Sequence, residues 1–133
     1  MKNSLTGGVH HVGLTTSKLE ETASFFVDTL QWTEVKRNND YPAIFVTDGT
    51  IMLTLWAAKS SNITEFDRTA NICLHHLALM VKSDKALAQI YQRLTSVGAS
   101  IEFSPELLKN GPAKHMMCYE PSGIRIEFIW PAA

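Results

Sequence analysis

Residues 9–16 read Val-His-His-Val-Gly-Leu-Thr-Thr, and residues 74–81 read Leu-His-His-Leu-Ala-Leu-Met-Val. The two stretches share a His-His pair followed by alternating apolar residues, and about half of the 133-residue chain separates them. Alternation of this kind is typical of a β-strand with one buried face. Because a helical pattern follows each stretch, the repeat predicts two copies of one structural unit.

The helical pattern after each His-His stretch has its own end signals. In the first copy, apolar residues recur at helical spacing over residues 19–30, and Ser17 with Glu20 matches a capping box. In the second copy, the same spacing over residues 87–97 ends before Gly98, and glycine commonly follows the last turn of a helix. Each copy therefore predicts a strand followed by a helix.

Three further β-type segments follow each predicted helix. They are residues 33–36, 42–47 and 50–56 in the first copy, and residues 100–103, 114–120 and 124–130 in the second. Asp48-Gly49 and Pro121-Ser122-Gly123 supply the last turn of each copy. Each copy therefore has the element order βαβββ.

Length and composition fit one globular domain. The chain has 133 residues, of which 45% are hydrophobic and 19% are charged, and this composition excludes disordered and fibrous classes. The predicted fold class is α+β, with two tandem βαβββ modules whose curved mixed sheets surround a cleft. We expect a single domain over residues 1–133, with modules at 8–57 and 74–130 joined by a linker at 58–73.

Charge and cysteine content exclude several classes of function. The formal net charge is −1 and no basic stripe is present, so we expect no nucleic-acid partner. The apolar runs are too short to cross a membrane, and residues 1–8 lack the apolar core of a secretion signal. Cys73 and Cys118 do not make a disulfide framework. These features favour a cytoplasmic protein.

Strand alternation predicts which side chains share a face. In each predicted strand the apolar set faces the helices, so the other set faces the opposite side. That second set contains His11 in the first strand, His76 in the strand of the second copy, and Glu127 in the last strand. Two imidazoles and one carboxylate can hold a divalent metal and leave positions open for a substrate. Nitrogen and oxygen ligands of this kind suit Fe, Mn, Ni, Co or Zn.

Each of these residues also has a structural interpretation. A single inward histidine is more often a hydrogen-bonded core residue, and Glu127 has Arg125 as an alternative partner. His10 and His75 lie one residue outside the inward register, which favours strand-start positions or groups that orient the ligands. His115 begins a strand, and we interpret it either as a proton shuttle or as a solvated histidine.

Apolar residues on the same face predict a pocket wall. The predicted substrate-binding residues are Met52, Trp56, Met80 and Arg125. The three apolar ones suit a substrate with a hydrophobic or aromatic part, with plain core packing as the alternative. Arg125 suits an anionic group, with a surface position as the alternative. The residue types leave the catalytic group unassigned, with His115 and Arg125 as candidates.

Three segments together resemble the vicinal oxygen chelate superfamily. They are His-Val-Gly-Leu at 11–14, His-Leu-Ala-Leu at 76–79, and the closing pattern aromatic-x-Pro-x-Gly-x-x-x-Glu at 119–127. The superfamily includes glyoxalase I, fosfomycin-resistance thiol transferases, extradiol dioxygenases, methylmalonyl-CoA epimerase and metal-free bleomycin-resistance proteins. The resemblance spans residues 8–130.

The resemblance implies a small-molecule metalloenzyme. His11, His76 and Glu127 match the metal-ligand positions of the superfamily. The implied metal acts as a Lewis acid on two neighbouring oxygens of the substrate, and the implied reaction is that of a lyase, a dioxygenase or a thiol transferase. The resemblance also implies a homodimer, in which the metal site can be shared between the subunits.

The chain departs from the superfamily at several positions. Where glyoxalase I carries a fourth ligand, a glutamate, alternation places Met52 and alignment of the turn glycines places Leu53. A thioether does not accept a proton at neutral pH, so standard glyoxalase I activity is not expected. Fosfomycin transferases carry a threonine and a tyrosine where this chain has Gly13 and Met117. A second hypothesis, from a different class, is a metal-free protein that sequesters a drug or ligand, and the histidine pair argues against it because metal-free relatives generally lack that pair.

Overall fold

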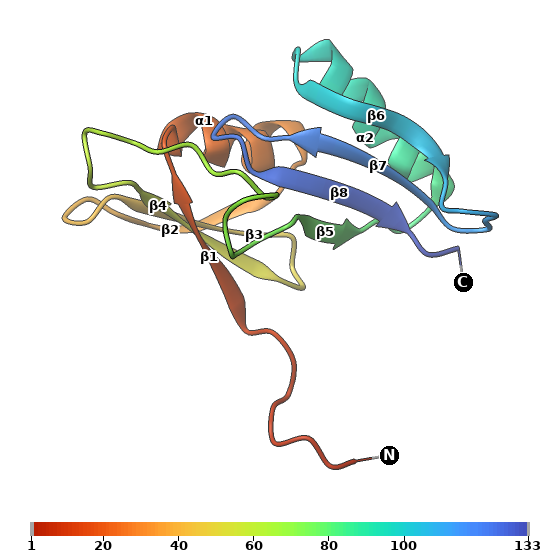
Figure 1. The fold of residues 1–133 in the computed structure, drawn as a ribbon, viewed down its shortest axis with the longest axis horizontal. Coiled ribbons are helices and arrows are strands. Elements are labelled where there is room, and N and C mark those ends of the chain that lie inside the picture. Colours follow the sequence, from red (N-terminus) through yellow and green to blue (C-terminus); the bar gives the residue numbers. More distant parts are fainter. Residues whose placement is uncertain (1, 133) are drawn as a thin grey trace. The chain divides into compact units, whose positions relative to one another are not determined.

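The structure is a computed structural model that describes residues 2–132. The chain divides into two compact units, which we call unit 1 (Met1–Lys59) and unit 2 (Ser60–Ala133). Each unit has one four-stranded sheet with parallel and antiparallel neighbours, and a helix follows its first strand (Figure 1). The predicted α+β class, with two βαβββ modules, is therefore confirmed.

Unit 1 holds the sheet of the first copy. Its elements are β1 (His11–Thr16), α1 (Leu19–Ser24), the π-helical turn η1 (Phe25–Thr29), β2 (Thr33–Asn38), β3 (Ala43–Thr47) and β4 (Met52–Ala57). The strand order is β1-β4-β3-β2, and only the β1–β4 pair of this sheet is parallel. A parallel pair needs a long connection, which α1, β2 and β3 supply.

Unit 2 repeats this connectivity. Its elements are β5 (Leu77–Met80), α2 (Asp84–Ser96), β6 (Ser100–Leu107), β7 (Lys114–Tyr119) and β8 (Arg125–Trp130). The strand order is β5-β8-β7-β6, with β5 parallel to β8. Helix α2 packs against β6, β7 and β8 on one face of this sheet (Figure 1). The opposite face of each sheet is called its open face below.

The two helices begin differently. Ser83 caps α2, because its Oγ accepts a hydrogen bond from the backbone N–H of Ala86 at 3.0 Å, and Gly98 follows the helix with a φ of +72°. Helix α1 has Lys18 at its N-cap and no side-chain cap, so the predicted capping box at Ser17 is wrong. The helix begins too late for Ser17 to reach its free N–H groups. No helix within residues 2–132 combines the length and apolar character needed to cross a lipid bilayer.

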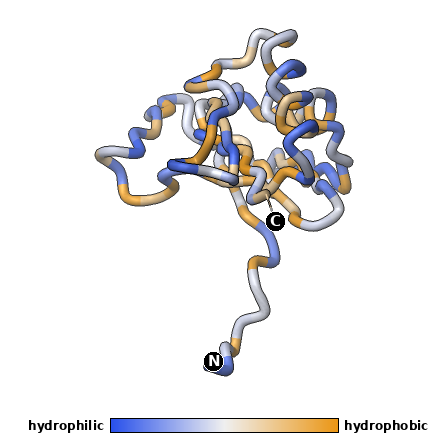
Figure 2. Tube along the Cα trace, turned by 90° about the vertical axis from the view of Figure 1, so that its right-hand side faces the viewer, coloured by the Kyte–Doolittle hydropathy of each residue, from blue (hydrophilic) through white to orange (hydrophobic). Residues whose placement is uncertain are grey.

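The apolar side chains that pack on the helix alternate along the central strands with side chains of the open face. Leu53 and Leu55 of β4 are fully buried on the helix side of unit 1, as is Ile126 of β8 in unit 2. Met80 of β5 lies on the open face and is 75% exposed. Figure 2 shows hydrophobic and hydrophilic residues interspersed along the chain. Burial of the helix-side set therefore fixes which side chains face outward.

Strand β6 extends beyond the predicted segment 100–103 and ends at Leu107. Its pairing with β7 shifts register twice, between Ile101 and Phe103 and between Phe103 and Glu106. Each shift breaks the two-residue alternation on which sequence reading depends. Pro105 is compatible with this strand because β6 is the edge of its sheet.

Two neighbouring residues on β4 test the assignment of the faces. Leu53→Ala removes a fully buried side chain and should lower the free energy of unfolding by about 2–5 kcal/mol. Met52→Ala on the open face should cost less than half as much. Urea unfolding of both variants measures the two changes. Equal losses would show that the register of β4 is wrong.

Candidate functional site

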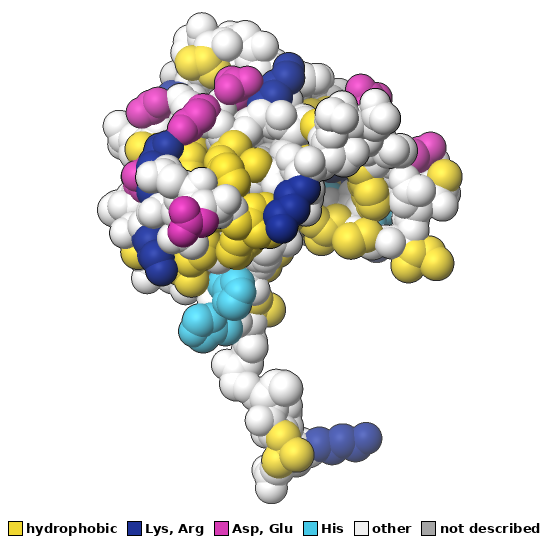
Figure 3. All heavy atoms as spheres, turned by 90° about the vertical axis from the view of Figure 1, so that its left-hand side faces the viewer, with side chains coloured by type: hydrophobic (Ala, Val, Ile, Leu, Met, Phe, Trp, Pro, Cys, Tyr) yellow, Lys and Arg dark blue, Asp and Glu magenta, His cyan; other side chains and the backbone are white. Residues whose placement is uncertain are grey.

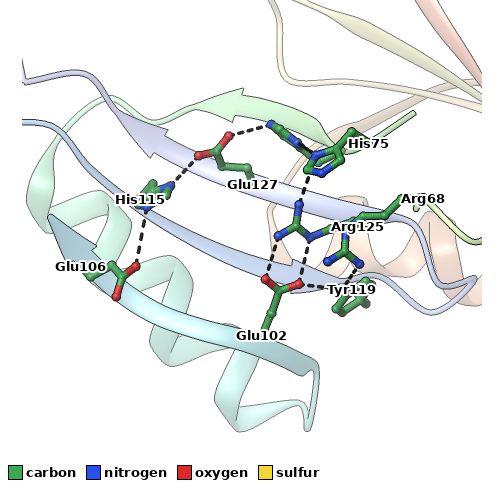
Figure 4. Close-up of polar contacts among 9 residues, drawn as sticks. Arg68, His75, Glu102, Glu106, His115, Tyr119, Arg125 and Glu127 are labelled. Atoms are coloured by element: carbon green, nitrogen blue, oxygen red, sulfur yellow. Dashed lines mark hydrogen bonds and ion pairs between the residues drawn. The ribbon is translucent and has the colours of Figure 1, made fainter. Parts of the chain in front are cut away.

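Two of the predicted metal ligands meet on the open face of unit 2. His76 immediately precedes β5, and Glu127 lies on the neighbouring strand β8. Their Nε2 and Oε1 atoms are 3.1 Å apart (Figure 4). The Glu127 side chain is only 11% exposed, whereas that of His76 is 33% exposed. A carboxylate so little exposed to water needs partners that offset the loss of hydration.

His115 on β7 holds the other oxygen of Glu127. Its Nδ1 lies 2.6 Å from Oε2, and its ring contacts Phe103 with 4.9 Å between centroids. The His115 side chain is 14% exposed, so the interpretation as a solvated histidine is wrong. A carboxylate only accepts hydrogen bonds, so the Nδ1 proton of His115 lies in this contact. Both oxygens of Glu127 therefore have an imidazole partner.

Arg125 on β8 binds a different carboxylate. Its Nε and Nη2 atoms donate to the two oxygens of Glu102 at 2.9 and 2.7 Å. Tyr119 also donates to Glu102, and Arg68 donates to the hydroxyl of Tyr119 (Figure 4). The guanidinium and this hydroxyl lower the pKa of Glu102 to about 2, and Glu102 raises the pKa of Arg125. The alternative pairing of Glu127 with Arg125 is therefore wrong.

A third hydrogen bond of Arg125 connects it to the histidine pair. Its Nη1 lies 3.4 Å from Nδ1 of His75, and Nδ1 of His75 lies 2.8 Å from Nδ1 of His76. Either of the two Nδ1 atoms can carry the proton of the 2.8 Å contact between the histidines.

Nε2 of His76 and Oε1 of Glu127 are 3.1 Å apart, a distance at which either a proton on Nε2 or a metal cation can lie between them. Two ligand atoms at about 2.1 Å from one metal ion lie roughly 3.0–3.4 Å apart in common geometries. The pair therefore fits two positions of a divalent metal site, with a proton on His76 as the other cation.

His11, the third predicted ligand, lies on the open face of unit 1. It is exposed on β1, and its Nδ1 is 2.9 Å from Nδ1 of His10. Histidine side chains gather where the N-terminal segment joins this strand (Figure 3). In each unit, a second histidine therefore contacts Nδ1 of the candidate ligand. It is His10 beside His11 in unit 1 and His75 beside His76 in unit 2. The sequence pattern alone left the roles of His10 and His75 open.

The strand registers correct the fourth ligand position. In unit 1, Gly13 of β1 pairs with Thr54, and in unit 2 the equivalent Ala78 pairs with Glu127. Thr54, rather than Met52, therefore occupies the position that corresponds to Glu127. Its Oγ1 accepts a hydrogen bond from Nε1 of Trp56 at 2.9 Å. A threonine hydroxyl is no carboxylate, so unit 1 still lacks the fourth acidic ligand.

Aromatic side chains surround Trp56 in unit 1. Its ring centroid lies 5.1 Å from that of Tyr41 and 5.8 Å from that of Phe45. Nζ of Lys59 lies 4.0 Å from the centroid of Tyr41, which is a cation–π contact. Trp56 is half-buried in this group, which we call the aromatic cluster.

Within residues 2–132, no three His, Cys, Asp or Glu side chains converge on one point as a preformed metal site. The structure brings His76 and Glu127 together and places His11 in the other unit. Sequence reasoning missed Glu102 and Tyr119 as partners of Arg125. Their contacts cross three strands, and the register shifts of β6 hide this neighbourhood from a pattern of alternation.

Residues 8–128 match the family model of the Glyoxalase/Bleomycin resistance protein/Dioxygenase superfamily. No curated protein sequence matches the chain at a significant level. The superfamily description names several activities, so the match is to a fold family with diverse chemistry.

Solved structures with similar folds cover nearly the whole chain. A glyoxylase/bleomycin resistance protein/dioxygenase domain from Frankia sp. EAN1pec has a TM-score of 0.83 at 24% identity, covering 95% of this chain and 98% of its own. A lactoylglutathione lyase from Agrobacterium tumefaciens has a TM-score of 0.74 at 14% identity, covering 96% of both chains. The fosfomycin resistance protein FosX from Listeria monocytogenes has a TM-score of 0.75 at 16% identity, covering 95% and 94%. These likenesses show the fold.

The Glu102–Arg125 pair predicts a loss of stability in acid. The folded protein holds the pKa of Glu102 at about 2 against an ordinary value of 4.5, so the unfolded chain takes up the proton first as the pH falls. The stabilisation is complete above pH 4.5 and disappears as the pH falls through about 2. The difference in unfolding free energy between the wild-type protein and Glu102→Gln should shrink over this range. Urea unfolding at several pH values measures it, and a constant difference would contradict the ion pair.

Proposed function

The chain belongs to the Glyoxalase/Bleomycin resistance protein/Dioxygenase superfamily, and we propose that it is a metal-dependent enzyme acting on a small molecule. His76 and Glu127 supply two ligands, and His11 completes the set. The observation that carries the proposal is the 3.1 Å approach of Nε2 of His76 to Oε1 of Glu127. In this proposal the two units form one domain over residues 1–133.

The proposal gives separate roles to the metal ligands, to His115 and to Arg125. When bound, a divalent ion such as Fe, Mn, Ni, Co or Zn supplies Lewis-acid chemistry toward two neighbouring oxygens of a substrate. His115 holds the second oxygen of Glu127 and so orients the carboxylate. Three guanidinium nitrogens of Arg125 already have protein partners, which disfavours a role in binding substrate. Arg125 is instead a positioning residue.

The missing fourth carboxylate narrows the reaction class. Isomerisation of the glyoxalase I type needs a base that moves a proton next to a carbonyl. Thr54 and Met52, the two residues nearest that position on the open face of unit 1, do not supply such a base at neutral pH. We therefore propose a lyase, dioxygenase or thiol-transfer reaction that does not depend on a second glutamate.

The aromatic cluster supports a substrate with a hydrophobic or aromatic part. Tyr41, Phe45 and Trp56 present rings on the open face of unit 1, and Met80 presents an exposed thioether on that of unit 2. The same cluster favours a second candidate, a metal-free protein that sequesters an aromatic ligand. Binding of a ligand that chelators do not weaken would favour the second candidate.

Removing the proposed ligands should abolish metal binding. His11→Ala, His76→Ala and Glu127→Gln should each lose stoichiometric binding of a divalent ion, because each removes one donor from the set of three. Titration with Ni²⁺ or Zn²⁺ against a competing chelator measures the affinity. Glu106→Gln is the matched control, because its carboxylate is 59% exposed and 3.9 Å from His115. Unchanged affinity in His76→Ala would defeat the ligand assignment.

We also propose a homodimer in which the metal site is shared between subunits. The support is membership of a superfamily in which dimers are common. Apolar side chains such as Val9, at 69% exposure, and Ile72, fully exposed, are available for an interface.

A mixed dimer distinguishes a shared site from a site within one subunit. A heterodimer of His11→Ala and His76→Ala chains should recover half of the wild-type metal content if the subunits share ligands, because one of its two sites is then complete. Neither homodimer should bind the metal. Metal analysis of differently tagged, co-expressed chains measures this. No recovery in the heterodimer would assign all three ligands to one subunit.

A further inference from the structure

We propose that the aromatic cluster and two lysines beside it bind an aromatic carboxylate, a ligand that is both flat and negatively charged. The inference deepens the proposed function, because it names the class of substrate. It rests on that function only for the statement that the bound ligand is the substrate. The observations that carry it all lie on the open face of unit 1.

The open face of unit 1 carries positive charge and no acidic strand residue. The strand registers place Met52, Thr54 and Trp56 of β4 on this face, together with the residues that pair with them across β1, β3 and β2. None of these paired strand residues is an aspartate or a glutamate, and Lys36 of β2, which pairs with Phe45, is one of them. The strands therefore offer an anion a cation and no repelling carboxylate.

Two ammonium groups lie beside the rings of the aromatic cluster. Nζ of Lys59 lies 4.0 Å from the ring centroid of Tyr41, and Nζ of Lys36 lies 5.8 Å from that of Phe45. Both lysines are exposed, and within residues 2–132 neither forms an ion pair with a carboxylate. Because no protein carboxylate neutralises these two charges, they remain available to an anionic ligand.

Trp56 supplies ring surface for the aromatic part of the ligand. Its indole meets Tyr41 at an interplanar angle of 66° and Phe45 at 56°, so neither ring stacks in parallel on it. Trp56 is also only half-buried. Flat aromatic groups gain affinity by offset stacking on such a ring. A ring on Trp56 with its carboxylate toward a lysine uses both properties of this face.

Gly13 and Thr54 hold the indole in place. Nε1 of Trp56 donates to Oγ1 of Thr54 at 2.9 Å. A Cβ added at Gly13 would lie 3.2 Å from this Oγ1 and 3.6 Å from Nε1 of Trp56. A side chain at position 13 would therefore crowd the hydrogen-bonded pair. Gly13 thus shapes the ligand site without contributing a side chain to it.

An NMR titration of metal-free, ¹⁵N-labelled protein tests the proposal with 2-naphthoate and with its neutral counterpart 2-naphthamide. The acid should bind about three- to fivefold more tightly than the amide, as expected for an exposed ion pair. The indole N–H signal of Trp56, identified with Trp56→Phe, should shift, while that of Trp32, which packs on Phe26, should not. Equal affinity for the two probes, or a Trp56 signal that stays in place, would overturn the proposal.

Substitutions on the same face separate the charge from the rings. Lys36→Gln and Lys59→Gln should each reduce the preference for the acid over the amide, and Lys85→Gln on α2 is the control, because Lys85 is equally exposed but belongs to unit 2. Trp56→Leu and Gly13→Ala should weaken both probes, the former roughly three- to tenfold. An unchanged preference for the acid when both Lys36 and Lys59 are replaced would assign the charge recognition elsewhere and overturn the proposal.

Adding Zn²⁺ to the same titrations separates this inference from the proposed function. If the aromatic carboxylate is the substrate of the metal site, Zn²⁺ should tighten its binding, and His76→Ala should remove that effect. Binding of 2-naphthoate that Zn²⁺ does not change would defeat the link to a metal-dependent enzyme. The preference for the acid over the amide would still decide whether this face is a site for aromatic anions.

Discussion

The side-chain contacts on the open face of unit 2 are organised around the carboxylate of Glu127, which is charged in a place that little water reaches. A charge in such a place is stable only if polar groups replace the lost hydration. Glu127 has an imidazole at each oxygen, His76 on one side and His115 on the other. Each imidazole has further contacts that limit its rotation, from His75 in one case and from the ring of Phe103 in the other. The result is a rigid carboxylate supported by a second layer of side chains, an arrangement that is typical of metal sites.

The two units share one topology but differ in chemistry. In unit 2, the positions that face away from the helix carry Glu127 and Arg125, and these connect histidines, glutamates and a tyrosine into one network. In unit 1, the equivalent positions carry Thr54 and Met52, and the neighbouring groups are aromatic. The two copies of the scaffold therefore differ in the side chains on their open faces. The open face of unit 2 carries charged and hydrogen-bonding groups, and that of unit 1 carries mainly aromatic and apolar ones.

The fold and the faces of the strands followed from the sequence because both rest on the alternation of apolar side chains along the strands. Alternation correctly placed His76 and Glu127 on the face opposite the helix, since Leu79 and Ile126 have to be buried. It did not place Thr54 opposite Gly13, because alignment of turns fixes a register only to within a residue or two. It also did not reveal the partner of Arg125. Glu102 lies within a register shift on an edge strand, where the alternation of faces is interrupted.

The irregular edge of the second sheet has a consequence for self-association. A straight edge strand exposes unpaired backbone groups, to which a strand of another molecule adds readily. Strand β6 carries Pro105 and two register shifts along this edge, so its backbone does not present a continuous row of donors and acceptors. These features protect the sheet from open-ended stacking and amyloid-like growth. The β6 edge of unit 2 is therefore a poor site for the addition of a strand from another molecule.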